Sequence, residues 1–536
     1  MSDWTEQSRE LVAKQIERRK FLKGMLGISG LALAQGTGLA RALLPTSTAA
    51  ALPGSLDNFT TIVVGMMENR SFDHYFGWLG PELGGVQEGF SNPTSLEPAP
   101  GGCSPVDPLA VDDATPVSTF HLEHHCQVPD PDHGWDGGRV ELNHGQLNGF
   151  VERSGQVAMG YFKPEDIPFS AWLVNNYTTF SNYFCSVLGP TFPNRRYLHS
   201  AQSGGIRDNS IPFPTPDNPL PTGHPWPTIW DRLTDAGVDW AFYGSDLPTI
   251  ALFFNDVWDP RNIGKVRHIV DFYIDAALGI LPRVAFIDPA FFTYGNDDHP
   301  ARDIKFGQRF IQDAFLAVAE GPQWYDPKTG KGAAWVMTYD EWGGFYDHVA
   351  PPTAPDLLSN PDHCEDWGQL GFRVPTMLAS PFSKQNLVGT NVYDHTSILK
   401  MIEWNFNLAP LTPRDAAANN LAEVLDFSQA PRVELPSEPP FIPLHLASLW
   451  CAQSQTVEFT DGENPLEVIP DVPLPPPAIP GNPLPPTGSI LPPAASLAKS
   501  PDQFEEPHHE MVALADAGFY GKLDFRERAK DGVWRE

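Results

Sequence analysis

The sequence has few basic side chains for its size. Its 536 residues include 35 Lys and Arg against 66 Asp and Glu, which gives a formal net charge of −31. Such a surface repels a polyanion at every approach, so nucleic acid is excluded as a partner. A small anion is not excluded, because a metal ion and a helix N-terminus can hold a phosphate locally.

Cysteine is also scarce. Five cysteines are present and no two of them form a Cys-x-x-Cys pair, which argues against a zinc knuckle. An oxidising compartment would allow one disulfide, such as Cys103 with Cys126. Because the number is odd, at least one thiol is free or paired outside the chain. The cysteines are Cys103, Cys126, Cys185, Cys364 and Cys451.

The amino-terminal region lacks the unbroken apolar stretch of a membrane span. Residues 18–20 are Arg-Arg-Lys, and the run at 24–44 is only weakly apolar, with five glycines. Three alanines at 49–51 follow, as at a cleavage site. This order resembles a twin-arginine signal. Residues 1–51 are therefore predicted to be a signal peptide that the twin-arginine export machinery recognises, which would make the protein periplasmic or secreted.

Short apolar runs alternate with helical patterns along the chain. This alternation favours an α/β fold with a mostly parallel central sheet flanked by helices. The run at 59–67 is expected to be the central strand, and ligands are expected beyond the carboxyl ends of the strands. The expected strands are 59–67, 238–243, 284–287, 334–338 and 374–378, and the expected helices are 230–236, 301–319 and 395–406.

Composition divides the chain into three regions. Residues 1–51 are the predicted signal, residues 52–440 the main domain, and residues 441–536 a carboxy-terminal extension. Proline is so frequent in this extension that much of it is predicted to be an extended arm. Within the main domain, residues 80–130 are rich in Pro, Gly and Ser and are predicted to form long loops, with no function assigned.

The stretch from Gly189 to Arg195 reads Gly-Pro-Thr-Phe-Pro-Asn-Arg. Thr191 is predicted to be a helix N-cap, with the amides of the first turn facing whatever Thr191 holds. The frame Thr-x-Pro-x-Arg is similar to the sulfatase frame, in which Cys or Ser becomes an aldehyde. Threonine cannot form that aldehyde, so a direct hydroxyl nucleophile is the functional hypothesis. A simple capped helix is the alternative for an isolated Thr-x-Pro.

A threonine hydroxyl is a weak nucleophile near neutral pH, so it needs a metal ion or a base. Two pairs, Glu68-Asn69 and Asp340-Glu341, each follow a predicted strand. Their carboxylate and amide oxygens suit Ca²⁺, Mg²⁺ or Mn²⁺, and iron or zinc also remains open. The alternative is that these are surface acids at strand ends.

Four segments resemble, in the same order, those of the bacterial phosphoesterase family of phospholipase C and acid phosphatase. The resemblance covers residues 58–427. It implies an alkaline-phosphatase-like α/β core and a phosphoesterase domain over 52–440. The segments are Glu68-Asn69-Arg70-Ser71-Phe72-Asp73-His74, Gly189-Pro190-Thr191-Phe192-Pro193-Asn194-Arg195, Thr338-Tyr339-Asp340-Glu341-Trp342-Gly343-Gly344-Phe345-Tyr346-Asp347-His348-Val349 and Tyr393-Asp394-His395-Thr396-Ser397-Ile398-Leu399.

The resemblance also implies roles for individual residues. One divalent metal ion would be bound by Glu68, Asn69, Thr191, Asp340 and Glu341. The substrate phosphate would be held by Asn69 and by histidines, for which His133 and His299 are the best matches, and His348 is a further candidate. His395, at a probable helix start, is interpreted as structural.

The predicted reaction is in-line attack by Thr191, which gives a phosphothreonine enzyme that water then hydrolyses. His133 or His299 would protonate the leaving alcohol. The expected substrate is a phospholipid such as phosphatidylcholine, met at a membrane surface. The family's longer phospholipases carry carboxy-terminal β-domains that this chain is not expected to have, so an acid phosphatase acting on phosphomonoesters is an alternative. A non-catalytic exported phosphate-binding protein is a second alternative.

Overall fold

The computed structural model describes residues 57–442 with several short gaps. The gaps are 99–107, 113–115, 124, 127–129, 211–223, 225, 247, 255–258, 292–294, 301 and 360–365. The predicted signal peptide lies outside the described residues, and so does the carboxy-terminal extension after residue 442.

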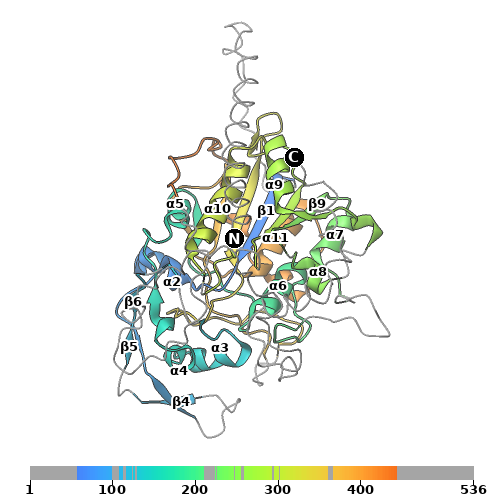
Figure 1. The fold of residues 1–536 in the computed structure, drawn as a ribbon. Coiled ribbons are helices and arrows are strands. Elements are labelled where there is room, and N and C mark those ends of the chain that lie inside the picture. The colour runs from blue at the N-terminus through green and yellow to red at the C-terminus, as the bar shows by residue number, and fades with distance from the viewer. Residues whose placement is uncertain are drawn as a thin grey trace, which may run out of the picture. The chain divides into compact units, whose positions relative to one another are not determined.

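A nine-stranded sheet lies at the centre of this body (Figure 1). The adjacent strands β10, β9, β11, β1 and β13 pair with one another in parallel, and β15 is parallel to β8. Strand β14 is antiparallel to both of its neighbours, and β12 pairs antiparallel with β13. The order is β10 (Val266–His268), β9 (Trp240–Gly244), β11 (Val284–Asp288), β1 (Phe59–Met67), β13 (Lys331–Tyr339), β14 (Met377–Ala379), β8 (Thr178–Phe180) and β15 (Leu387–Gly389), with β12 (Tyr325–Asp326) beside β13.

Strand β1 is central, as its sequence predicts. Eight of its nine residues are buried, because a parallel strand in the middle of a sheet is covered on both faces. Its register with β13 places Met67 opposite Tyr339. The next residues, Glu68 and Asp340, therefore leave the sheet side by side at its carboxyl edge.

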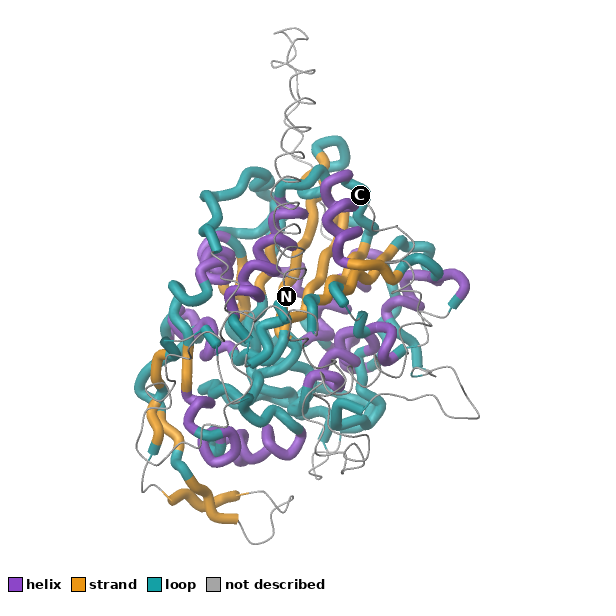
Figure 2. The backbone as a smooth tube through the Cα atoms, in the orientation of Figure 1, coloured by secondary structure: helices purple, strands orange, loops and turns teal. Residues whose placement is uncertain are grey.

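Two groups of helices flank the sheet, and loops gather beyond the end at which β1 leads into α2 (Figures 1 and 2). Helix α10 contacts α5, α9 and β13, whereas α6 contacts α7 and α11. The helices are α2 (Phe72–Phe76), α3 (Trp135–Leu142), α4 (Phe150–Ser154), α5 (Pro168–Asn176), α6 (Thr191–Ser200), α7 (Ile229–Asp235), α8 (Ile250–Phe253), α9 (Ile269–Leu278), α10 (Ile304–Ala319), α11 (His395–Phe406) and α12 (Pro413–Ala417).

Local sequence signals set the starts of the long helices. The Asp303 side chain accepts a hydrogen bond from the Lys305 amide at 3.0 Å, so α10 begins at Ile304, three residues later than predicted. Asp394 and Ser397 form a capping box at the start of α11, whose bounds are those predicted. The mostly parallel α/β architecture expected from the alternating pattern is confirmed.

Two expectations need correction. Only the last two residues of the run at 374–378 lie in β14, so the strand begins later than predicted. It is antiparallel to its neighbours, because no helix lies between β13 and β14 among the described residues and a parallel pairing needs a long crossover. The segment 80–130 is not only loop. It contributes the short strands β2 (Ser91–Asn92), β3 (Ser95–Pro98), β4 (Pro108–Asp112), β5 (Val117–Ser118) and β6 (Phe120–His121), and β6 pairs with β7 (Gly160–Tyr161).

Two cysteines lie within the described residues. Cys126 is disulfide-bonded and Cys185 is a free, buried thiol. Cys103, Cys364 and Cys451 lie outside the described residues, so the predicted Cys103–Cys126 pairing stays a prediction. Over the described part of the chain, no helix is both long and apolar enough to span a bilayer.

Phe315 of α10 packs this helix onto the sheet. Its ring is fully buried and lies edge-on to Trp335 of β13, with centroids 5.3 Å apart. We expect Phe315→Ala to lower the free energy of unfolding by about 3–5 kcal/mol, because it leaves a cavity in a close-packed interior. Urea unfolding measures this change. Leu278→Ala, at a side chain that is 58% exposed, is the control and should cost less than about 0.5 kcal/mol.

Candidate active site

Three carboxylates meet at the carboxyl edge of the sheet. Glu68, Asp340 and Glu341 are at most 1% exposed. Asp340 Oδ1 accepts hydrogen bonds from the Asn69 amide at 3.0 Å and from the Glu341 amide at 2.8 Å. Glu341 Oε2 accepts one from the Gly343 amide at 2.7 Å. These backbone donors fix the two loops that follow β1 and β13 against each other.

Thr191 joins this group from a distant part of the chain. Its hydroxyl Oγ1 donates a hydrogen bond to Glu68 Oε2 at 3.2 Å. The predicted capping role is wrong, because Pro190 is the N-cap of α6 and Thr191 is its first residue. The helix therefore directs the hydroxyl at the carboxylates and not back at its own amides.

The expected cradle of first-turn amides is also corrected. The Phe192 amide already donates to Asn209 Oδ1 at 2.8 Å, and Pro193 has no N–H group. What the helix start supplies to a bound phosphate is chiefly the positive end of its dipole.

Asn69 links the carboxylates to two histidines. The backbone of Asn69 is left-handed, with φ +58°. Its carbonyl oxygen lies so close to Gly343 that a Cβ added there would be only 2.2 Å away, so the loop after β13 needs glycine at this position. Asn69 Nδ2 lies 3.2 Å from His133 Nε2 and 3.1 Å from His299 Nε2. The Asn69 amide nitrogen therefore lies within hydrogen-bond distance of both rings.

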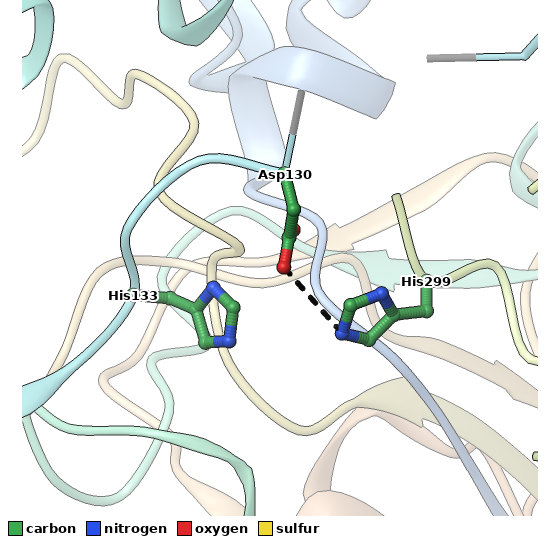
Figure 3. Close-up of side chains that lie close together, drawn as sticks. All are labelled: Asp130, His133 and His299. Atoms are coloured by element: carbon green, nitrogen blue, oxygen red, sulfur yellow. Dashed lines mark ion pairs between the residues drawn. The ribbon is translucent and has the colours of Figure 1, made fainter. Parts of the chain in front are cut away.

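Both imidazole rings are oriented by the backbone. His133 Nδ1 donates to the Pro131 carbonyl at 2.8 Å, and His299 Nδ1 donates to the Pro300 carbonyl at 3.1 Å. The Nε2 atoms consequently face the centre of the site. The Asp130 carboxylate points between the two rings, 3.9 Å from His299 Nε2 (Figure 3).

Three buried oxygens around this centre have no hydrogen-bond partner. They are Asn69 Oδ1, Asp340 Oδ2 and Glu341 Oε1. Burying unpaired acceptors and clustered negative charge is costly unless a cation compensates them. The donor set is made of carboxylate, amide and hydroxyl oxygens, which is the set a divalent cation takes. The residues predicted as metal ligands therefore fit a cation.

The pKa values reflect the same excess of negative charge. Burial raises the pKa of Glu68 well above its ordinary value, and the Asp340 carboxylate raises it further. Burial likewise raises the pKa of Glu341. For His133, burial lowers the pKa, but the carboxylates of Glu341 and Asp130 outweigh burial and the pKa lies well above its ordinary value.

His299 shifts in the opposite direction. Burial lowers its pKa well below the ordinary value, and the charge of His133 lowers it further. The two rings that face Asn69 are thus prepared for different protonation states. Such a separation is typical of a pair that divides acid and base roles.

Arg195 is a functional residue to which the sequence analysis assigned no role. Its Nε donates to Glu68 Oε1 at 3.0 Å and its Nη1 donates to Asp288 Oδ1 at 3.2 Å. It is fully buried, so it holds Glu68 in place and offsets part of its charge. The signal was present in the sequence, because the frame Thr-x-Pro-x-Arg puts Arg195 four residues, about one helical turn, after Thr191.

Asp130 was also missed. It was counted as the last residue of a loop segment, although it lies three residues before His133 and shares a possible ligand group with His133 and His299. An Asp-x-x-His spacing could have suggested it. Without the fold, however, nothing in the sequence brings this pair to His299.

The remaining histidines lie elsewhere. His348 pairs through Nδ1 with Asp73, in a cluster that also contains Asp347 and Arg373. Its ring therefore faces Asp73 and not Asn69, and its role in substrate binding stays a prediction. His395 Nε2 donates to the Asp340 carbonyl at 2.7 Å, which is a supporting contact of the kind the structural interpretation expects.

Comparison with known proteins places this geometry in a family. Residues 59–409 match the phosphoesterase family. The chain is 32% identical to non-specific phospholipase C1 of Arabidopsis thaliana over 430 residues, which cover 72% of this chain and 74% of that protein. It is 32% identical to phospholipase C B of Mycobacterium tuberculosis H37Rv over 438 residues, which cover 72% and 81%.

Among solved structures, the chain is similar to a protein in the alkaline phosphatase superfamily from Vibrio parahaemolyticus. The TM-score is 0.32 and the identity 10%, over 70% of this chain and 73% of that chain. The family match and the identity to the two phospholipases carry the assignment. This chain belongs to the phosphoesterase family and is a phosphoric ester hydrolase.

Proposed function

We propose that this protein is a metal-dependent phospholipase C that cleaves phospholipids through a phosphothreonine intermediate on Thr191. The observation that carries the proposal is the convergence of the Thr191 hydroxyl with four buried groups from two neighbouring strand ends, three of whose oxygens have no partner. One divalent cation would be held by Glu68, Asn69, Thr191, Asp340 and Glu341. When bound, the cation would neutralise phosphoryl charge and favour the ionised Thr191 hydroxyl.

The chain's own residues then account for the steps. Thr191 Oγ1 attacks phosphorus, and Glu68 Oε2, which already accepts its hydrogen bond, is in place to take the proton. The bond to the leaving alcohol breaks on the opposite side of phosphorus. Burial lowers the pKa of His133, but the carboxylates of Glu341 and Asp130 raise it by more, and its Nε2 is placed to donate to the leaving oxygen or to the phosphoryl group. His299, whose pKa burial lowers, is suited to take a proton from the water that attacks phosphothreonine, and the proton held by Glu68 returns to Thr191 Oγ1 as its bond to phosphorus breaks.

The substrate class follows from the relatives. The similar proteins of Arabidopsis thaliana and Mycobacterium tuberculosis are named phospholipases C, which favours a phosphodiester lipid over a phosphomonoester. Phosphatidylcholine at a membrane surface is the proposed substrate. The same catalytic groups would serve an acid phosphatase, so turnover of a phospholipid and turnover of a phosphomonoester should be compared under the same conditions.

Thr191→Ala should lower turnover of phosphatidylcholine vesicles by roughly 10⁴-fold or more while the protein stays folded, because the substitution removes the hydroxyl that attacks phosphorus. Thr191→Ser is the matched control and should keep measurable activity. Turnover and circular dichroism are measured together, with p-nitrophenyl phosphate as the monoester substrate. A near-normal rate for Thr191→Ala would remove Thr191 from its role, and faster turnover of the monoester would favour the phosphatase.

Removal of the metal should inactivate the enzyme. We expect dialysis against a strong chelator to abolish activity and to lower the melting temperature, because three buried carboxylates are then left without a compensating cation. Adding back Ca²⁺, Mg²⁺, Mn²⁺, Fe²⁺ or Zn²⁺ one at a time should restore both and identify the metal. Elemental analysis of the protein before dialysis should give one equivalent. Full activity in a sample shown to be metal-free would contradict the proposed cofactor.

We also propose that the protein is exported through the twin-arginine machinery. The support is the Arg18-Arg19 pair before the weakly apolar run. Replacing both arginines with lysine should leave the protein uncleaved in the cytoplasm, because lysine keeps the charge but not the pair that the machinery recognises. Fractionation and immunoblotting measure the outcome. Unchanged export of the variant would contradict this route.

A further inference from the structure

The segment that follows the metal ligands is buried but takes no part in the proposed chemistry. Arg70 and Tyr75 are both fully buried, and both reach the loop of residues 297–300 that carries His299. We call residues 297–300 the His299 loop. Their contacts suggest a reason why this stretch of the sequence has so many polar residues in the interior.

Asp298 is the centre of these contacts. It is 1% exposed and adopts a left-handed backbone with φ +73°, a conformation that costs energy for a residue with a side chain. Its Oδ2 accepts hydrogen bonds from the hydroxyl of Tyr75 at 3.2 Å and from that of Tyr339 at 2.5 Å. The two tyrosines thus hold the carboxyl group from α2 and from the end of β13.

Helix α10 packs against the same carboxyl group. A Cβ added at Gly307 would lie only 1.7 Å from Asp298 Oδ1, so the helix carries glycine where Asp298 packs against it. The Asp298 side chain is therefore enclosed by tyrosine hydroxyls on one side and by the α10 backbone on the other. It has little freedom to rotate.

Arg70 fixes the backbone of the loop. Its Nε and Nη2 donate to the Asp298 carbonyl at 2.9 and 2.7 Å. Its Nη1 donates to His74 Nε2 at 3.0 Å, and His74 Nδ1 donates in turn to the Gly160 carbonyl at 2.7 Å. This chain of hydrogen bonds requires a neutral His74, and burial does lower its pKa well below the ordinary value.

Asp297 ties the loop to the metal ligands. Its carbonyl accepts a hydrogen bond from the Glu68 amide at 2.8 Å, and its carboxylate accepts one from the His299 amide at 3.2 Å. The residues on both sides of Asp298 are thereby aligned with the end of β1. The His299 ring emerges from this fixed loop 3.1 Å from Asn69.

We propose that Tyr75, Tyr339 and Asp298 are positioning residues for His299. They hold a left-handed turn that would otherwise relax, and through it they set the distance between His299 Nε2 and the phosphate site. The hydroxyls act through the loop and not on the substrate, so their loss should affect turnover more than substrate binding. This inference rests on the role of His299 in the proposed function.

The test compares Tyr75→Phe, Tyr339→Phe and the double variant with the full-length metal-loaded enzyme. We expect the double variant to lower kcat by about 10- to 100-fold, with KM changed by less than about twofold and metal content unchanged. Tyr243→Phe is the matched control. Tyr243 also donates a buried hydrogen bond to an aspartate, Asp275 at 2.7 Å, but on β9 and α9, so it should lose stability without losing turnover.

A double-mutant cycle with His299→Gln separates positioning from a general loss of stability. If the tyrosines act through His299, adding both Phe substitutions to His299→Gln should lower kcat by less than about twofold more. Additive losses would overturn the inference, and so would a kcat that stays normal in the double variant. A normal kcat in His299→Gln would also overturn it and would remove His299 from the proposed reaction, whereas activity in Thr191→Ala would contradict the proposed nucleophile alone.

Discussion

The site depends on negative charge held in a dry interior. Glu68, Asp340 and Glu341 lie together at the edge of the sheet and are buried. The guanidinium of Arg195 contacts Glu68. A carboxylate moved out of water without a partner is costly enough that it either binds a proton or attracts a cation. Burial raises the pKa values of Glu68 and Glu341, which reflects this cost. The proposed divalent cation would offset this charge.

Rigidity comes from the short segment that follows β1. Glu68 and Asn69 line the site, and Arg70 and Tyr75 contact the His299 loop. Ser71 donates to the Tyr346 carbonyl at 2.7 Å in the loop after Glu341. One buried stretch thus connects both loops that carry functional groups. A site built in this way is organised before substrate arrives, so little of the binding energy goes to ordering side chains.

Much of the fold could be predicted because the sheet's strands are buried on both faces. Such strands appear in the sequence as unbroken apolar runs, and β1, β11 and β13 were found from them. The direction of β14 could not be predicted, because it depends on how the chain returns after Asp340. The apolar sequence of this three-residue strand is compatible with either direction, and only the connection decides between them.

The sequence by itself determined the ligand types and their order along the chain, since carboxylates, an amide and a hydroxyl at strand and helix ends are local features. Tertiary structure alone decided which of them meet. It brought Asp130 to His299 across 169 positions, joined Arg195 to Glu68, turned His348 towards Asp73, and gave the Phe192 amide to Asn209. These contacts join segments far apart in the chain, and their energies depend on burial and distance, which no local pattern contains.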